Sequence, residues 1–198
     1  MDRTASRPWA ELPDSAAQTV IGVLTDIDDT LTTQGAATGD ALRAIAALRG
    51  AGLHVIPITG RPVGWSEPFA REWPVDAIVA ENGAVALVHT APGELRKIYQ
   101  QDEALRRANY QRMQQVARRI VQEVPGAMLS TDSPGRETDI AIDHSEFTTL
   151  PADAIARVVA LMQDEGMNAT VSSIHINGWL GDHDKLAGAR WIVRELFG

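Results

Sequence analysis

The 198-residue sequence contains no cysteine, and all its apolar runs are short. Disulfide bonds and thiolate zinc sites are therefore excluded, and the composition fits a cytoplasmic protein. The longest apolar runs fall well short of the roughly 20 residues that a membrane-spanning helix needs. The first 18 residues, MDRTASRPWAELPDSAAQ, have no apolar segment of the kind found in signal peptides, and we expect them to form a mobile arm.

Basic residues are also fewer than acidic residues. The chain has 18 Lys and Arg residues against 26 Asp and Glu residues, a formal net charge of -8. This charge argues against nucleic acid or an anionic membrane surface as a partner. Hydrophobic residues make up 44% of the chain, which is enough for a core, and the length suits one large domain or two small ones.

What the sequence does contain is an alternation of short apolar runs and amphipathic segments. Strands are predicted at 20–25, 53–58 and 77–80, and helices at 40–49 and 65–72. Short connections between such elements are typical of a doubly wound α/β fold with a parallel sheet. In such sheets, ligands bind at the carboxyl ends of the strands. Asp26, Thr59 and the pair Glu81-Asn82 all follow predicted strands, so we expect them to converge.

The pattern changes after Gly83. The next predicted elements are a hairpin of strands 85–89 and 95–99, a helix 103–124, a strand 139–143, a helix 151–165 and a strand 171–180. A final helix is predicted at 184–197, and we expect it to belong to the same unit as residues 19–84. We therefore expect an α/β core of residues 19–84 and 181–198, with residues 85–180 inserted as an α+β cap domain.

An acidic cluster follows the first predicted strand, in the stretch TVIGVLTDIDDTLTTQG. Asp26, Asp28 and Asp29 stand close together there, although like charges repel and desolvation is costly. One interpretation is that Asp28, Asp29 and Thr30 only cap the following turn. The other is that Asp26 attacks phosphorus while Asp28 donates and then accepts a proton, with Mg²⁺ among the oxygens. The residue types alone leave both open.

Four motifs carry a resemblance to a known family: TDIDDTL, ITGRP, AENGA and GDHDKLAGARWIV, in that order. The chain resembles the haloacid dehalogenase-like (HAD) hydrolase superfamily. It is most similar to the subfamily IIB phosphatases, such as the mannosyl-3-phosphoglycerate, sucrose-phosphate and trehalose-phosphate phosphatases, which carry an α+β cap. The motifs cover residues 20–84 and 181–198, whereas the likeness across the cap is one of architecture.

The resemblance implies a Mg²⁺-dependent phosphatase that acts through an aspartyl-phosphate. Its substrate would be a small phosphorylated metabolite, such as a sugar phosphate or a phosphoglycerate conjugate. Asp26 matches the nucleophile, and Asp28 matches the general acid and base whose backbone carbonyl also binds the metal. Thr59 matches the hydroxyl that binds a phosphoryl oxygen, and Lys185 matches the lysine that offsets negative charge. Without the resemblance, Thr59 could also be interpreted as a turn residue, and Lys185 as a solvated residue of a helix. Asp29 stands where the family often has glycine.

Further residues are candidates for contact with the substrate. Gly60 and Arg61 belong to the second motif, Asn82 follows the third strand, and Arg136 precedes the strand that ends at Asp143. Ser172, Ser173 and His175 are candidate contacts from the predicted cap.

The fourth motif of the family, an acidic loop that supplies metal carboxylates, has no match after Lys185. We expect the chain to lack the last strands of the core, which would leave the first strand open to self-association. In an alternative alignment, the stretch GDHD at 181–184 supplies the acidic loop, with Asp182 as a candidate metal ligand. That alignment places the lysine after its own acidic motif.

Two other function classes stay open. A phospho-receiver signalling domain also uses acidic residues, a threonine and a lysine around Mg²⁺. It needs an acceptor aspartate after the third strand, however, and here the strands end at Thr59 and Glu81. A catalytically silent HAD-like binding or assembly protein would explain the missing fourth motif. A phosphatase assay with Mg²⁺ separates these classes.

Overall fold

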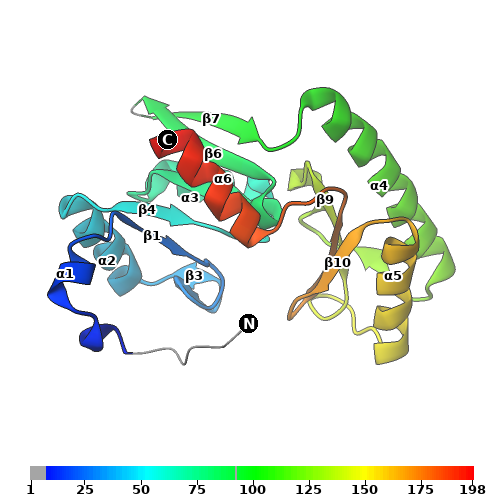
Figure 1. The fold of residues 1–198 in the computed structure, drawn as a ribbon. Helices are drawn as coiled ribbons and strands as arrows, with labels where there is room; N and C mark the ends of the chain where they lie inside the picture. The colour runs from blue at the N-terminus through cyan, green and yellow to red at the C-terminus, as the bar shows by residue number, and fades with distance from the viewer. Residues whose placement is uncertain (1–7, 92) are drawn as a thin grey trace.

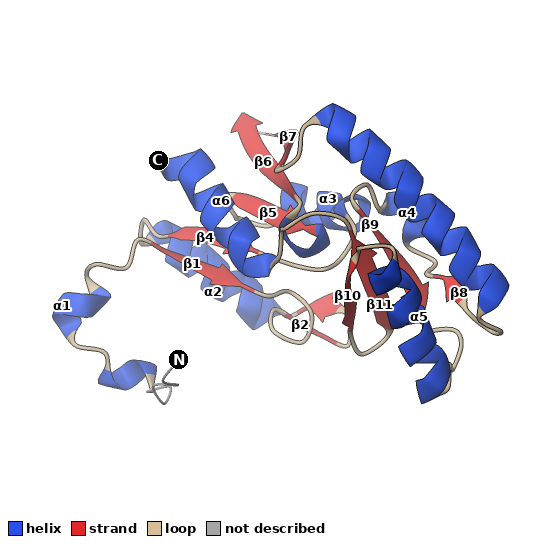
Figure 2. Ribbon diagram, turned by 45° about the vertical axis from the view of Figure 1, so that its right-hand side comes forward, coloured by secondary structure: helices blue, strands red, loops and turns tan. Residues whose placement is uncertain are grey.

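The computed structural model describes residues 8–91 and 93–198. Its elements form two groups that lie side by side in both views (Figures 1 and 2). We call residues 8–99 and 185–198 the core unit and residues 103–179 the distal unit. Within the described part of the chain, no helix is long and apolar enough to cross a membrane.

The core unit is built on a mixed sheet. In spatial order its strands are β1 (Gly22–Thr25), β4 (His54–Pro57), β5 (Ala77–Ala80), β6 (Val85–Ala91) and β7 (Glu94–Tyr99). β1 and β4 are parallel, with Val23 opposite Val55, and a parallel bridge between Ile58 and Val79 connects β4 to β5. The sheet continues antiparallel through β6 and β7.

Helices cover both faces of this sheet. They are α2 (Gly39–Gly50), α3 (Val63–Glu72) and α6 (Lys185–Phe197). Ile78 belongs to the hydrophobic cluster that includes residues of α2 and α3, whereas its neighbour Val79 packs with Ile192 of α6. This alternation follows from the period of two along a strand. The predicted doubly wound α/β fold is therefore confirmed.

Short elements complete the core unit. Residues 1–7 of the predicted arm lie outside the described residues, and the rest of it forms η1 (Trp9–Glu11) and α1 (Asp14–Ala17). A small hairpin of β2 (Thr32–Thr33) and β3 (Ala36–Ala37) follows the acidic cluster. The turn η2 (Glu81–Gly83) connects β5 to β6.

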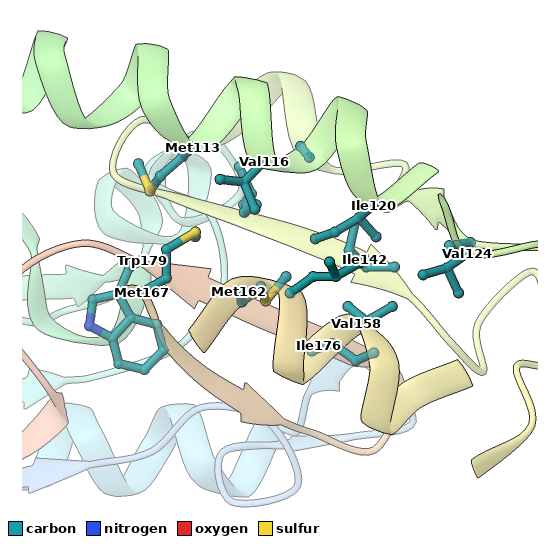
Figure 3. Close-up of a cluster of buried hydrophobic side chains, with 14 of the residues drawn as sticks. Met113, Val116, Ile120, Val124, Ile142, Val158, Met162, Met167, Ile176 and Trp179 are labelled. Carbon is teal, nitrogen blue, oxygen red and sulfur yellow. The ribbon is translucent and has the colours of Figure 1, made fainter. Parts of the chain in front are cut away.

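The distal unit is an antiparallel sheet covered by two helices. Its strand order is β10 (Asn168–Val171), β11 (His175–Trp179), β9 (Asp139–Asp143) and β8 (Met128–Leu129). The helices are α4 (Glu103–Glu123) and α5 (Ala152–Asp164), and η3 (Ser133–Gly135) precedes β9. Ile120 of α4 and Val158 of α5 meet Ile142 and Ile176 of the sheet in a buried cluster (Figure 3). This unit therefore has a hydrophobic core of its own.

The hairpin of β6 and β7 lies elsewhere than the sequence indicated. It extends the core sheet through the pairing of β6 with β5, instead of belonging to the cap. Val85 and Leu87 pack in the cluster of α2 and α3, and Ala86 and Val88 pack in the cluster of α6. A strand that is apolar on both faces needs cover on both faces, and the core sheet supplies it.

Two predicted strands also differ in extent. β1 is shorter than predicted and is not buried on both faces, because Leu24 is 43% exposed and the preceding Ile21 is 67% exposed. Among the described residues, β1 pairs only with β4, so its other edge is open. The single strand predicted at 171–180 is divided into β10 and β11 by a turn.

Candidate active site

Asp26 lies at the carboxyl end of β1, where the chain leaves the sheet. Its Oδ1 accepts a hydrogen bond from the backbone N–H of Ile27 at 2.8 Å, and its Oδ2 lies 2.8 Å from Nζ of Lys185, the first residue of α6. The Asp26 and Lys185 side chains are 44% and 45% exposed. An exposed ion pair adds little stability, so its significance lies in holding a carboxylate beside a cation at a strand end.

The loop after Asp26 winds around the carbonyl oxygen of Ile27. That oxygen accepts hydrogen bonds from the N–H groups of Leu31 and Thr32, at 2.9 and 3.1 Å, and from the Thr32 hydroxyl at 3.2 Å. The Ile27 side chain is fully buried and anchors the loop. The residues on either side of it, Asp26 and Asp28, consequently both line one cleft.

Arg61 forms an ion pair with the carboxylate of Asp28. Its Nε lies 3.2 Å from both carboxylate oxygens, and its Nη2 lies 3.0 Å from Oδ1. The guanidinium carbon also lies 5.1 Å from the centre of the Trp65 ring, a cation–π distance. Arg61 follows β4 closely, so two neighbouring strand ends meet through this ion pair.

Thr59 and Asn82 support the loop that carries Arg61. The Thr59 side chain is fully buried, and its hydroxyl accepts a hydrogen bond from the N–H of Arg61 at 3.0 Å. The N–H of Asn82 donates to the carbonyl oxygen of Thr59, also at 3.0 Å. Thr59 therefore lies behind the loop and does not line the cleft, whereas Asn82 and Gly60 do.

Arg136 reaches the cleft from the distal unit, but carboxylates already surround it. It donates to Asp132 through Nε and Nη2, both at 3.0 Å, and to Asp139 through Nη1 at 2.8 Å. Nη1 also lies 3.4 Å from the carbonyl oxygen of Gly60 in the core unit. Although burial alone would lower it, the pKa of Arg136 is raised by these carboxylates. Arg136 thus connects the two units, which limits it as a free cation for a substrate.

These residues surround a cleft of about 680 Å³ between the two units. The predicted site residues that line it are Asp26, Asp28, Gly60, Arg61, Asn82, Arg136 and Lys185. The facing wall comes from β10, β11 and the turn between them, with Ser172, Ser173, His175 and Asn177. Nε2 of His175 is held 2.8 Å from a carboxylate oxygen of Glu146.

The alternative acidic loop reaches the cleft only at its last residue, Asp184. Asp182 does not line it, and the carboxylate of Asp184 accepts a hydrogen bond from the N–H of Ala187, which caps α6. Within the described ranges, no three His, Cys, Asp or Glu residues form a metal-binding group. Asp26 and the carbonyl of Asp28 are left as candidate ligands. Because Mg²⁺ keeps several waters and can bind through one or two carboxylates, this oxygen set fits a hydrated ion.

No role was predicted from the sequence for the side chain of Glu81. It is fully buried, and burial together with the nearby carboxylate of Asp139 raises the pKa of Glu81 to about 7. The only sequence feature that could have indicated it is the position of this glutamate directly after an apolar strand. His183 is also buried, which lowers its pKa to about 4.

Residues 23–117 match the family model of the haloacid dehalogenase-like hydrolases. The chain has a haloacid dehalogenase-like core. The matched residues include Asp26, Asp28 and the loop of Thr59, so the predicted family resemblance is confirmed. No curated protein sequence matches the chain.

Solved structures with the same haloacid dehalogenase-like fold include phosphatases. A protein of Thermoplasma acidophilum superposes with a TM-score of 0.69 at 12% identity, over 87% of this chain and 69% of that one. The sucrose-phosphatase of Synechocystis, in complex with sucrose and phosphate, gives 0.64 at 12%, over 89% and 70%. The C-terminal domain of trehalose-6-phosphate phosphatase from C. albicans gives 0.62 at 13%, over 88% and 61%. The chain thus spans 61% to 70% of the length of these structures.

Proposed function

We propose that this chain is a phosphatase that hydrolyses a small phosphorylated metabolite in the cleft. The observation that carries the proposal is the contact between Asp26 and Lys185, 2.8 Å apart although 159 positions separate them in the sequence. A carboxylate at a strand end is suited to attack phosphorus, and the adjacent ammonium offsets the charge of carboxylate and phosphate.

The first chemical step transfers the phosphoryl group to the protein. A carboxylate oxygen of Asp26 attacks phosphorus in line, the bond from phosphorus to the leaving oxygen breaks, and the protonated carboxyl of Asp28 gives its proton to that oxygen. The products are an aspartyl-phosphate and the free alcohol. Arg61 is paired with Asp28 in the structure, and a phosphoryl group competes for the guanidinium because both anions accept bidentate hydrogen bonds.

The second step returns the phosphoryl group to water. The carboxylate of Asp28 takes a proton from a water molecule while the water oxygen attacks phosphorus. The bond from phosphorus to Asp26 breaks, which releases inorganic phosphate and leaves Asp28 protonated for the next cycle. Phosphoryl transfer depends mainly on positioning and charge stabilisation, and Lys185 and Arg61 provide both from the chain itself.

Mg²⁺ would be held by the carboxylate of Asp26 and the backbone carbonyl of Asp28. When bound, the ion stabilises negative charge on the phosphoryl oxygens. Lys185 holds the second oxygen of Asp26, and so orients the carboxylate for attack.

The distal unit is proposed to act as a cap that contacts the leaving group. Its wall offers the hydroxyls of Ser172 and Ser173, the amide of Asn177 and the imidazole of His175, which suit a sugar. Because Arg136 is already paired with two carboxylates, the wall favours a neutral sugar over a second anionic group. We therefore propose a sugar phosphate in preference to a phosphoglycerate conjugate.

Release of inorganic phosphate from a panel of sugar phosphates, with and without Mg²⁺, tests the proposal. The Asp26→Asn variant should lose turnover, whereas Asp164→Asn, at an exposed position of α5, should keep it. In acid-quenched reactions of the wild-type chain, the phosphoryl label should be recovered on Asp26. Recovery of the label on Asp28 would reverse the assignment.

The same panel decides between the phosphatase and a silent binding protein. A chain that binds sugar phosphates in the cleft, but releases no phosphate with Mg²⁺ present, would be a binding protein. The observation that favours this second candidate is that the described residues offer no group of three metal-binding side chains.

A further inference from the structure

Glu81 occupies an unusual position at the end of β5. Its side chain is fully buried, and its backbone has a φ of 48°, followed by 54° at Asn82 and 107° at Gly83. A non-glycine residue with positive φ is uncommon, and strain of this kind persists only where the surroundings impose it. The contacts of Glu81 therefore have to provide that constraint.

The carboxylate of Glu81 accepts hydrogen bonds from both units. In the core unit, the N–H of Val63, at the start of α3, donates to Oε1 at 2.9 Å. In the distal unit, the N–H of Glu137 donates to Oε1 at 3.0 Å, and the N–H of Thr138 donates to Oε2 at 2.6 Å. The hydroxyl of Thr138 donates to Oε2 as well. The donors are all neutral groups, so the carboxylate serves as an acceptor and not as one half of an ion pair.

The backbone of the same turn holds the loop of Arg61. The N–H of Glu81 donates to the carbonyl oxygen of Arg61, and the N–H of Asn82 donates to that of Thr59, both at 3.0 Å. Together with the bond from Val63, these contacts fix both ends of the loop that places Arg61 against Asp28. Above pH 7, where Glu81 is ionised, an amide in place of the carboxylate would turn one of its two acceptor oxygens into a donor, facing N–H groups.

We propose that Glu81 is a positioning residue for the reaction, because it fixes the loop that holds the guanidinium of Arg61 at the cleft. The proposal rests on the proposed phosphatase function and extends it to a residue that touches neither substrate nor Asp26. The position of the Arg61 side chain then depends on the boundary between the two units, because Glu137 and Thr138 of the distal unit donate hydrogen bonds to Glu81.

A double-mutant cycle tests whether Glu81 acts through Arg61. The variants are Glu81→Gln, Arg61→Lys and the double variant, assayed for kcat/KM with 4-nitrophenyl phosphate at a pH above 7, where Glu81 is ionised. Glu81→Gln should lower kcat/KM about 10- to 100-fold, the scale expected for a misplaced catalytic group. In the Arg61→Lys background the same change should have little further effect, because residues that act as a unit are not additive. Equal losses in both backgrounds would overturn the proposal. Glu67→Gln, at a partly exposed glutamate of α3 that pairs with Arg71, is the matched control.

A second measurement does not depend on activity. The Nε–H of Arg61 donates to Asp28, so its signal in a ¹H–¹⁵N spectrum should exchange slowly with water in the wild-type chain. Glu81→Gln should speed this exchange at least about tenfold, as expected when a hydrogen bond to a charged group is weakened. An unchanged rate would refute the positioning role. If the wild-type chain hydrolyses no phosphate ester, the proposed function fails, and this measurement still decides whether Glu81 fixes Arg61.

Thr138 provides a milder change in case Glu81→Gln does not fold. Thr138→Val removes only the hydroxyl donor to Glu81, and Thr138→Ser restores it. We expect Thr138→Val to lower kcat/KM and to speed exchange at Arg61, and Thr138→Ser to recover both values. A Thr138→Val variant with the kcat/KM and the exchange rate of the wild type would refute the proposal, because it keeps the methyl group of Thr138 and lacks only the donor to Glu81.

Discussion

Gly188 of α6 packs directly on the backbone of Gly83. A Cβ atom built on Gly188 would lie 2.5 Å from the Cα of Gly83 and 3.0 Å from its carbonyl oxygen. The absence of both side chains lets the start of α6 approach the turn η2, and this approach brings Lys185 to Asp26. The site therefore depends on a contact between two glycines that take no part in its chemistry.

Gly188→Ala should accordingly displace α6 from η2. Overpacking of this kind costs about 1–3 kcal/mol of stability, and the shift should separate Lys185 from Asp26 and lower turnover. Thermal unfolding and steady-state phosphate release measure the two effects. Gly50→Ala in α2 is the matched control, because nothing lies within 4 Å of its Cβ position. If Gly188→Ala matches the control in both assays, the contact has no such role.

Loss of the Lys185 charge should impair the chemistry more than the fold. Its ion pair with Asp26 is about half exposed, so Lys185→Gln should change the free energy of unfolding by less than about 1 kcal/mol. Turnover should fall about 10²- to 10³-fold, the scale for removing one group that stabilises transition-state charge. Lys97 is the other lysine of the chain and pairs with Glu137. A loss no larger than that of Lys97→Gln would contradict the assignment.

The raised pKa of Glu81 predicts a pH dependence of stability. Between its ordinary value of 4.5 and about 7, the folded protein holds a proton on Glu81 that the unfolded chain releases. The contribution of this group to stability is therefore full below pH 4.5 and is lost as the pH rises through about 7. Urea unfolding across this range should show a steeper fall in the free energy of unfolding for the wild type than for Glu81→Gln. Parallel curves would contradict the prediction.

The open edge of β1 predicts self-association. Ile21 and Leu24 are exposed there, beside an apolar hollow of about 180 Å³ that Phe197 also lines. Unpaired strand edges with exposed apolar side chains pair with other chains. Sedimentation should show concentration-dependent association that Leu24→Lys reduces. Phe147→Ser, at another exposed apolar side chain, should not reduce it, and a wild-type chain that stays monomeric at all concentrations would refute the prediction.

The sequence indicated the core fold well because local patterns determine it. The apolar run before Asp26 and the spacing of the following helices are sufficient to predict a parallel sheet with ligands at its strand ends. The cleft accordingly contains Asp26, Asp28 and Lys185. By contrast, a hairpin pattern does not state which strand it will pair with, so β6 and β7 were assigned to the wrong unit.

The contacts of Arg136 and Glu81 could not be predicted from the sequence, for a different reason. Each depends on partners brought together by the tertiary structure: Asp132 and Asp139 for Arg136, and Thr138 for Glu81. A lone arginine before a strand gives no sign that two carboxylates will enclose it. The turn that divides β10 from β11 likewise contains Ser172 and Ser173 in place of glycine or proline, and was not recognised.

The enclosure of Arg136 bears on any attempt to redesign the specificity of the pocket. Replacing this arginine would leave the buried Asp139 and the partly buried Asp132 without their cation and would release the carbonyl of Gly60, so a library that varies it would mostly sample damaged proteins. Ser172 and Ser173 line the same cleft from an exposed turn. The hydroxyl of Ser172 holds the turn through hydrogen bonds with the backbone of His175. Mutations are therefore better directed at Ser173, where new side chains can meet a different leaving group.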